Sequence, residues 1–206
     1  MNISFLAKHP LPSSLFLLGV LVLGHGLYIQ AKAYLAQFLI AQAWQSTLAD
    51  QQVHKPWYWA DTYPVAKLSF VTKQESIAFK HQLESVYVLA GASGRTLAFG
   101  PGLVLSGAAI GEVGNTIIAG HRDTHFARLA AINKGDLLQL EARDGQQLLY
   151  QVVNTQIAHQ SETRFMAPSD DNRITLITCY PFNQLSGGAE QRYIVEALLV
   201  SKPKLI

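Results

Sequence analysis

The chain has 206 residues, of which 49% are hydrophobic and only 15% charged, and its formal net charge is +2 at pH 7. This composition argues against intrinsic disorder and, with a charged fraction well below the usual value of about 25%, against a wholly soluble protein. The near-neutral chain after Asp50 offers no basic stripe for nucleic acid, and the single cysteine, Cys179, excludes an internal disulfide framework and a zinc site of several cysteines.

The N-terminal segment is predicted to anchor the chain in a membrane. No charged residue occurs from position 9 to position 31, a stretch about 35 Å long as a helix, which is enough to cross a hydrocarbon core of about 30 Å. We expect a cytoplasmic N-terminus at residues 1–10 and a single transmembrane helix at residues 11–30 of the inner (cytoplasmic) membrane, with the remaining chain on the periplasmic or extracellular side. The alternative is a signal peptide cleaved at an A-x-A site, residues 31–33, which exports the same domain.

Residues 31–64 are predicted to be a helical stalk and linker. The segment 33–49 contains no Gly, Pro or charged residue and is rich in Ala, Leu and Gln, which favours a helix. That helix could stand as a stalk, lie on the membrane surface or pack on the domain that follows. The linker contains Trp57, Tyr58 and Trp59, which suit either a membrane interface or ordinary packing against a domain.

Residues 65–206 are predicted to form one mainly β domain. Short β-favouring runs alternate with Gly, Asn, Asp and Pro, which is typical of an antiparallel sandwich or a small closed barrel. Asp144-Gly145 predicts a hairpin, and Asn115 is expected to serve the turn before its strand. Brief helices are expected at Ser93 to Phe99 and Thr124 to Ile132. The predicted strands are Ala66–Val71, Ser85–Leu89, Thr116–Ala119, Leu137–Ala142, Leu148–Thr155, Ile174–Thr178 and Tyr193–Val200.

Three residues suited to acyl transfer lie at predicted strand ends. Cys179 ends an apolar run shortly before Pro181, where a substrate could reach the thiol. His121 follows a strand and a glycine, and histidine performs general acid–base catalysis near neutral pH. Arg192 begins the last strand and could donate to an oxyanion or to the substrate. The alternative is a buried cysteine acting as a small hydrophobe, a strand-end histidine and an arginine paired with Glu190 or Glu196.

The sequence resembles the sortases, the cysteine transpeptidases of bacterial surfaces. Thr175 to Cys179 is TLITC, which fits the family's T-L-x-T-C motif, while His121 follows a strand and Arg192 lies near the start of the final strand. The resemblance covers roughly residues 65–200. The longer stretches around His121 and Cys179 are most similar to class D-like sortases of the Gram-negative, so-called marine proteobacterial type.

This resemblance implies a sortase-like closed eight-stranded β-barrel with short helices, preceded by the transmembrane helix. It implies that Cys179 attacks the threonine carbonyl of an LPxTG-like C-terminal sorting signal, that His121 is the general acid and base, and that Arg192 holds the substrate or the oxyanion. The resulting thioester passes the substrate protein to an amine acceptor, whose identity is open. Thr178 is a further candidate for shaping the oxyanion hole, the alternative being simple strand packing. Two other functions stay open: an anchored cysteine hydrolase that uses water, and a non-catalytic β-barrel scaffold.

No metal centre and no cofactor are expected. His121 and His125 have the spacing of zinc ligands on a helix, but the stretch lacks the glutamate of HExxH and an evident third ligand. The segment 159–172, expected to help bind the sorting signal, carries several carboxylates that leave a dependence on calcium open. These carboxylates are those of Glu162, Asp170 and Asp171. The expected partners are the substrate protein with its sorting signal, the amine acceptor and membrane lipid.

Overall fold

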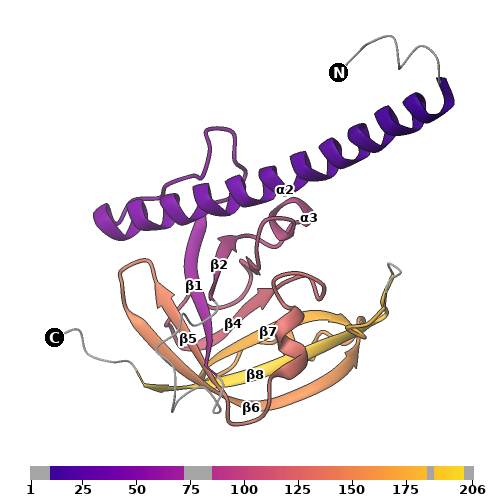
Figure 1. The fold of residues 1–206 in the computed structure, drawn as a ribbon. Helices are drawn as coiled ribbons and strands as arrows, with labels where there is room; N and C mark the ends of the chain where they lie inside the picture. The colour runs from indigo at the N-terminus through magenta and orange to yellow at the C-terminus, as the bar shows by residue number, and fades with distance from the viewer. Residues whose placement is uncertain (1–9, 72–84, 185–187, 202–206) are drawn as a thin grey trace, which may run out of the picture. The chain divides into compact units, whose positions relative to one another are not determined.

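The structure is a computed structural model that describes residues 10–71, 85–184 and 188–201. It divides the chain into two compact units, residues 1–38 and 39–206. One long helix, α2 (Pro10–Asp50), contributes to both units (Figure 1). Among the described residues, the first unit contains the N-terminal part of this helix, and the second contains its last residues together with the strands.

Within the first unit, α2 exposes apolar side chains on every side. The consecutive residues Leu15, Phe16, Leu17 and Leu18 are each more than half exposed. The stretch Ser14–Asp50 is long and apolar enough to cross a membrane by length and composition. Because a helix that is apolar all round is stabilised by lipid when no protein covers it, α2 is a candidate membrane span, as the sequence predicts.

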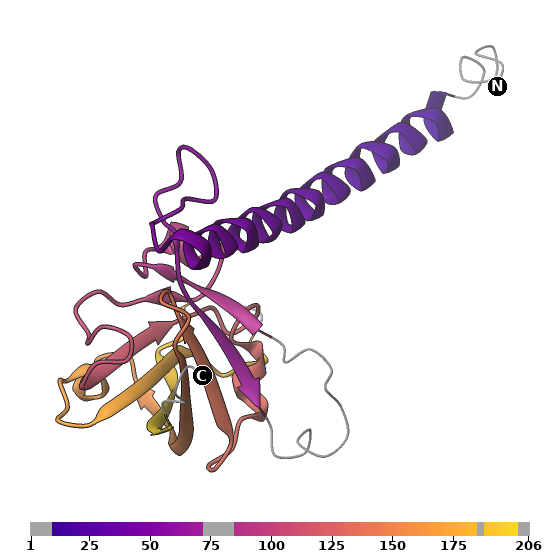
Figure 2. The same ribbon diagram turned by 90° about the vertical axis from the view of Figure 1, so that its left-hand side faces the viewer.

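The second unit contains a closed barrel of eight strands (Figures 1 and 2). Around the barrel the strand order is β1-β2-β3-β4-β7-β8-β6-β5. The prediction of a mainly β, closed eight-stranded barrel with short helices is confirmed. The strands are β1 (Pro64–Val71), β2 (Ser85–Ala90), β3 (Gly102–Leu103), β4 (Gly114–Ala119), β5 (Leu137–Ala142), β6 (Gln147–His159), β7 (Asn172–Tyr180) and β8 (Gln191–Ser201). The short helices are α3 (Gly94–Leu97) and the 3-10 turns η1 (Ala127–Ala131) and η2 (Arg164–Met166).

Alternating burial along the strands creates one core inside the barrel. In β5, Leu138 and Leu140 are fully buried while the residues that alternate with them are half-buried, as expected for a strand with one face inward. Tyr150 of β6 is buried in the same core, and its hydroxyl donates to Oδ1 of Asn172 at 3.0 Å. Burial raises the pKa of Tyr150 to about 12, so this hydroxyl keeps its proton and its hydrogen bond at neutral pH.

Two parallel strand pairs distinguish the barrel from the antiparallel arrangement that the sequence predicts. β2 runs parallel to β3, and β4 runs parallel to β7. The connection from β4 to β7 contains η1, β5, β6 and η2 rather than one crossover helix, so no sequence pattern marks the pairing. β3 escapes prediction because two residues are too few to show alternation. The predicted Asp144-Gly145 hairpin is confirmed between the antiparallel strands β5 and β6, with Gly145 at a φ of 78°.

The last part of α2 packs on the barrel. The indole Nε1 of Trp44 donates to Oε2 of Glu141 on β5 at 3.3 Å, and its ring lies 6.5 Å from that of Tyr87 on β2. Of the alternatives for segment 33–49, packing on the domain therefore holds for residues 39–50. The boundary between the two units falls within the range 31–64 that the sequence assigns to a stalk and linker. The buried side chains of this helix part follow helical spacing and are Ile40, Ala43, Trp44 and Thr47.

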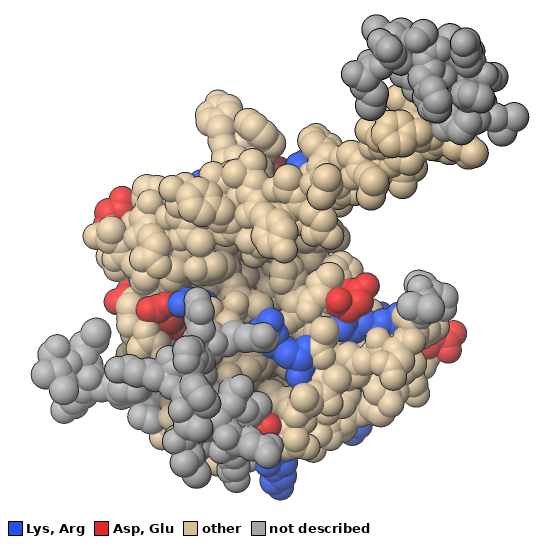
Figure 3. Space-filling view, viewed as in Figure 1, with Lys and Arg blue, Asp and Glu red and all other residues tan. Residues whose placement is uncertain are grey.

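The linker aromatics divide between packing and exposure. The ring of Trp57 lies 5.1 Å from that of Phe99 in an edge-to-face contact, so it joins the linker to the domain. Tyr58 and Trp59 are 95% and 77% exposed. On the face shown in Figure 3, basic and acidic side chains of the barrel lie interspersed and form no continuous basic stripe.

Candidate active site

Cys179 and Arg192 are direct neighbours on adjacent strands. They form a Cα pair in the antiparallel register of β7 and β8, and both are half-buried. Side chains so paired lie on the same face of a sheet with Cβ atoms about 5 Å apart. Ile174 and Leu176 of β7 belong to the buried core, and alternation therefore directs Cys179 to the outward face. The thiol and the guanidinium thus share one open face of the barrel.

His121 leaves β4 beside the end of the cysteine strand. The last parallel pair of β4 and β7 is Ala119 with Ile177, and the amide of Gly120 donates to the carbonyl of Ile177 at 3.0 Å. His121 lies two residues beyond this pair on β4, as Cys179 does on β7. Because parallel strands end at the same edge, the histidine and the cysteine emerge together at one end of the barrel. The His121 side chain is exposed.

Gly120 permits a close approach that no other residue allows. A Cβ at this position would lie 2.7 Å from the ring of Phe126, which is fully buried. The amide of Phe126 in turn donates to the carbonyl of His121 at 3.0 Å, which closes the turn after β4. The packing of the Phe126 ring therefore requires a glycine at position 120, and this glycine fixes the backbone from which His121 extends.

Thr178 joins the cysteine strand to the histidine strand. Its side chain is 2% exposed, and its Oγ1 donates to the carbonyl of Gly120 at 2.7 Å. This hydrogen bond therefore joins the residue that precedes Cys179 to the residue that precedes His121. The contribution of Thr178 that the structure describes is to hold these two strand ends together.

The guanidinium of Arg192 is oriented by neutral oxygens. Its Nη1 donates to the carbonyls of Ala189 at 2.7 Å and Gln191 at 3.0 Å, and its Nη2 donates to Oε1 of Gln160 at 3.2 Å. Glu196, one proposed partner, instead forms an ion pair with Arg173 at 3.3 Å. Among the described residues, the oxygens that Arg192 binds therefore orient its positive charge without neutralising it.

Two further residues of the segment after β4, Arg122 and His125, are half-buried. His125 is half-buried, and burial, then Arg128 and His121, hold its pKa below the usual value, so it is neutral at pH 7. Arg122 is half-buried, and its Nη2 donates to the carbonyl of Gln184 at 2.9 Å. This bond links the turn after β4 to the loop after the cysteine. Within residues 10–71, 85–184 and 188–201, no group of three His, Cys, Asp or Glu side chains is placed to hold a metal ion.

An apolar patch adjoins the cysteine and the arginine on the same face. Ile177 and Ile194 precede and follow Cys179 and Arg192 by two residues in their strands and form a cross-strand pair. Phe165, from η2 in the loop between β6 and β7, packs with them and is 8% exposed. The sequence points to the segment 159–172 as a whole, but no local pattern distinguishes Phe165 within it.

Comparison with known proteins gives a consistent family. The family model for the sortase domain matches residues 79–200. The chain is 36% identical over 85 residues to sortase D of Bacillus subtilis (strain 168), a match that covers 41% of this chain and 42% of that protein, which is well under two thirds of the relative's length. The catalytic domain of SrtD from B. anthracis is similar in structure, with a TM-score of 0.54 and 28% identity, covering 67% of this chain and 88% of that one. A Clostridium perfringens sortase D5 transpeptidase shares the fold with a TM-score of 0.56 and 21% identity, covering 78% and 89%.

Proposed function

Because the chain belongs to the sortase family and is similar to its class D members, we propose that it is a membrane-anchored cysteine transpeptidase. Its substrate is a protein with an LPxTG-like C-terminal sorting signal, and its second substrate is an amine. The observation that carries this proposal is the pairing of Cys179 with Arg192 across β7 and β8, with His121 leaving β4 at the same end of the barrel.

The proposed reaction proceeds in two balanced steps. The Cys179 thiol gives its proton to the His121 imidazole, and Sγ attacks the threonine carbonyl carbon, whose oxygen takes the electron pair beside Arg192. As the carbonyl reforms, the peptide bond breaks and the leaving amine takes the proton from His121, which leaves a thioester on Cys179. The acceptor amine then attacks the thioester carbon, its proton returns through His121 to the sulfur, and the product carries a new amide bond.

Within the part of the chain that the structure describes, Arg192 donates to neutral oxygens that leave its charge uncompensated, and this supports its part in the scheme. A fixed cation beside the carbonyl oxygen stabilises charge that develops only in the transition state, and it needs no reorganisation at that moment. The half-buried Ile177, which packs against the buried Ile194 and Phe165, supports an aliphatic side chain in the bound sorting signal, because such a chain gains by leaving water there. Every step uses side chains of this chain alone, so the proposal includes no metal or cofactor.

The proposed location follows from the candidate span. Residues 11–30 cross the inner membrane once, and the barrel lies on the periplasmic or extracellular side, where exported proteins present their C-terminal signals. Lipid is therefore a permanent partner of the chain.

Trapping the thioester tests the proposed function. The full chain in detergent is incubated with an LPETG-containing peptide in the presence and absence of hydroxylamine, and the products are measured by mass spectrometry. We expect a threonine hydroxamate with hydroxylamine, and no cleavage by Cys179→Ala. A free carboxylate formed at the same rate and in the same amount with and without the amine would favour the hydrolase. An uncleaved peptide, together with a Cys179 that resists alkylation, would favour the scaffold.

A further inference from the structure

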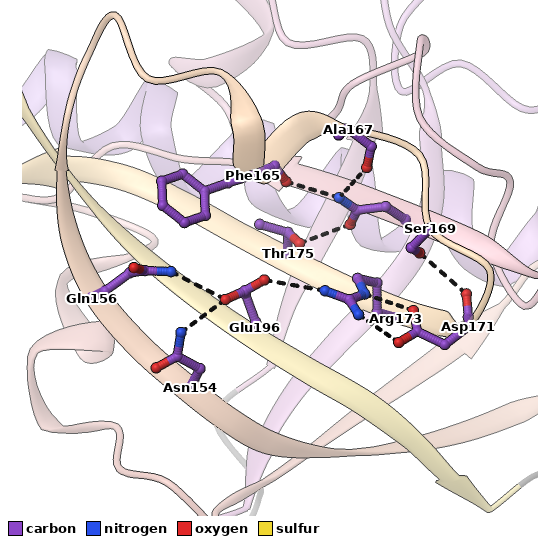
Figure 4. A network of polar contacts seen from close by, with 10 residues as sticks. Asn154, Gln156, Phe165, Ala167, Ser169, Asp171, Arg173, Thr175 and Glu196 are labelled. Carbon is purple, nitrogen blue, oxygen red and sulfur yellow. Dashed lines mark hydrogen bonds and ion pairs between the residues drawn. The ribbon is translucent and has the colours of Figure 1, made fainter.

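A buried asparagine on β4 contacts both the cysteine strand and the loop between β6 and β7. Asn115 is 4% exposed, and its Nδ2 donates to the carbonyl oxygens of Phe165 at 2.8 Å and Ala167 at 3.2 Å. Its Oδ1 accepts a hydrogen bond from Oγ1 of Thr175 at 2.7 Å. Figure 4 shows the partner residues Phe165, Ala167 and Thr175 converging on this point. The amide thus has a partner for each donor and for its oxygen, whereas the sequence suggested only a role in a turn.

The segments that meet at Asn115 are the ones that form the candidate active site. β4 runs from Asn115 to Ala119, two residues before His121, and β7 runs from Thr175 through Cys179. The loop 160–171 brings Phe165 onto the apolar patch beside Cys179. One side chain therefore connects the strand of the general acid, the strand of the nucleophile and the loop that faces the substrate.

An ion-pair network holds the far end of this loop. Arg173 donates through Nε to Oδ1 of Asp171 at 2.6 Å and through Nη1 to Oε1 of Glu196 at 3.3 Å (Figure 4). The hydrogen bond with Arg173 keeps the pKa of Asp171 below its usual value, so the pair is charged at neutral pH. Glu196 also accepts from Asn154 and Gln156. These contacts fix the end of the loop where β7 begins.

The start of the loop is held at the candidate active site itself. The amide of Gln160 donates to the carbonyl of Glu190 at 2.7 Å, and its side chain accepts from Arg192. Between the two ends, η2 is not held by close packing alone, because a pocket of about 330 Å³ adjoins it, lined by Asn115, Phe165 and Ala167 among others. The hydrogen bonds from Asn115 therefore hold η2 together with the packing of the Phe165 ring.

We propose that Asn115 is a positioning residue that holds η2 in its substrate-ready position and thereby sets the affinity for the sorting signal. A loop ordered before binding loses little conformational freedom when the substrate arrives, so the protein gains affinity without an added contact. Thr175 supports Asn115 by fixing which end of its amide faces the loop. The inference rests on the proposed function for its effect on affinity, but the ordering of the loop can be measured without any activity.

The test compares Asn115→Ala with two changes at Thr175, using the full chain in detergent. Thr175→Val removes the hydroxyl donor at constant shape, and Thr175→Ser retains it. Kinetics with an LPETG peptide give KM and kcat, alkylation by iodoacetamide reports on Cys179, and hydrogen exchange reports on the loop. The informative amides are those of Met166 and Ala167, which donate within η2 to the carbonyls of Thr163 and Arg164.

We expect Asn115→Ala to raise KM roughly tenfold, as the loss of two hydrogen bonds to the loop implies, with kcat and the alkylation rate within about twofold of the wild type. The amides of Met166 and Ala167 should exchange faster. Thr175→Val should change KM in the same direction, and Thr175→Ser should resemble the wild type. Asn133→Ala is the matched control, because Asn133 is exposed and bonds only within its own turn through the carbonyl of Ala131.

Three results would overturn the proposal. The first is an unchanged KM in Asn115→Ala, and the second is a fall in kcat and in alkylation of Cys179 with no change in KM. The third is wild-type exchange at Met166 and Ala167 in that variant. If the wild type does not cleave the peptide, the proposed function fails on its own, while hydrogen exchange still decides whether Asn115 holds the loop.

Discussion

Replacing Gly120 by alanine tests how the backbone before His121 is held in place. A Cβ at position 120 would lie 2.7, 2.8 and 3.1 Å from three ring carbons of Phe126. That ring is fully buried in the barrel core and cannot turn aside without displacing its neighbours. Overpacking of this kind costs about 1–3 kcal/mol, which lowers the melting temperature of a domain of this size by about 2–12 °C.

The same substitution should also lower activity. Relief of the clash moves the strand end that carries His121, and a displacement of about 1 Å at a catalytic group costs on the order of 10²-fold in rate. Thermal unfolding of the full chain in detergent and cleavage of an LPETG peptide measure the two effects. Gly94→Ala is the matched control, because nothing lies within 4 Å of a Cβ at position 94, in the short helix α3. A Gly120→Ala variant with the melting temperature and kcat/KM of the wild type would refute this reasoning.

Three further groups of changes have defined outcomes: substitutions of His121 and Arg192, N-terminal truncations and a substitution of His125. In peptide cleavage, His121→Ala should lower kcat/KM about 10²- to 10⁴-fold. Arg192→Lys should recover little of the loss seen with Arg192→Ala, since an ammonium lacks the planar guanidinium that the three oxygens orient. Wild-type rates in these variants would contradict both expectations. A chain that begins at Leu39 should be soluble and folded by circular dichroism. A chain shortened further to begin at Gln45 lacks Trp44 and should aggregate, because the barrel surface beneath that ring is uncovered. Equal behaviour of the two chains would contradict the packing of Trp44 on the barrel. Burial keeps the pKa of His125 below its usual value, so the unfolded chain binds the proton more readily and stability falls as pH drops through about 6.5. His125→Gln should therefore lose less melting temperature than the wild type between about pH 7.5 and pH 5.5, and an equal loss would count against this cause.

Strands can be predicted from the sequence where burial of one face makes apolar and polar residues alternate. Leu137–Ala142 was predicted with the bounds that the structure has for β5, because each second residue faces the core. The ends of β6 and β8 extend beyond the predicted ranges, since pairing between these two strands continues past the register shift between Val152 and Asn154, where the alternation of burial is interrupted. The two-residue strand β3 has no periodicity to detect.

The sequence predicts the candidate catalytic residues for a different reason. Cys179, His121 and Arg192 each belong to a chemically limited residue type at a strand end, and the T-L-x-T-C motif links them to a family. Their convergence was an expectation, because it depends on the parallel pairing of β4 with β7, which lies between segments that are distant in sequence. The contact of Arg122 with Gln184 depends on that same convergence.

The sequence by itself determined the apolar span, the β-rich domain and the residue types available for acyl transfer, because composition, period and motif are local properties of the chain. Only the tertiary structure decided what each polar side chain contacts. Asn115, placed by sequence in a turn, lies buried and binds Phe165 and Ala167, which lie 50 and 52 residues away along the chain. Glu196 pairs with Arg173 rather than with Arg192. Buried donors and acceptors must find partners wherever the fold brings them, and strand register, rather than position along the chain, determines which partners are within reach.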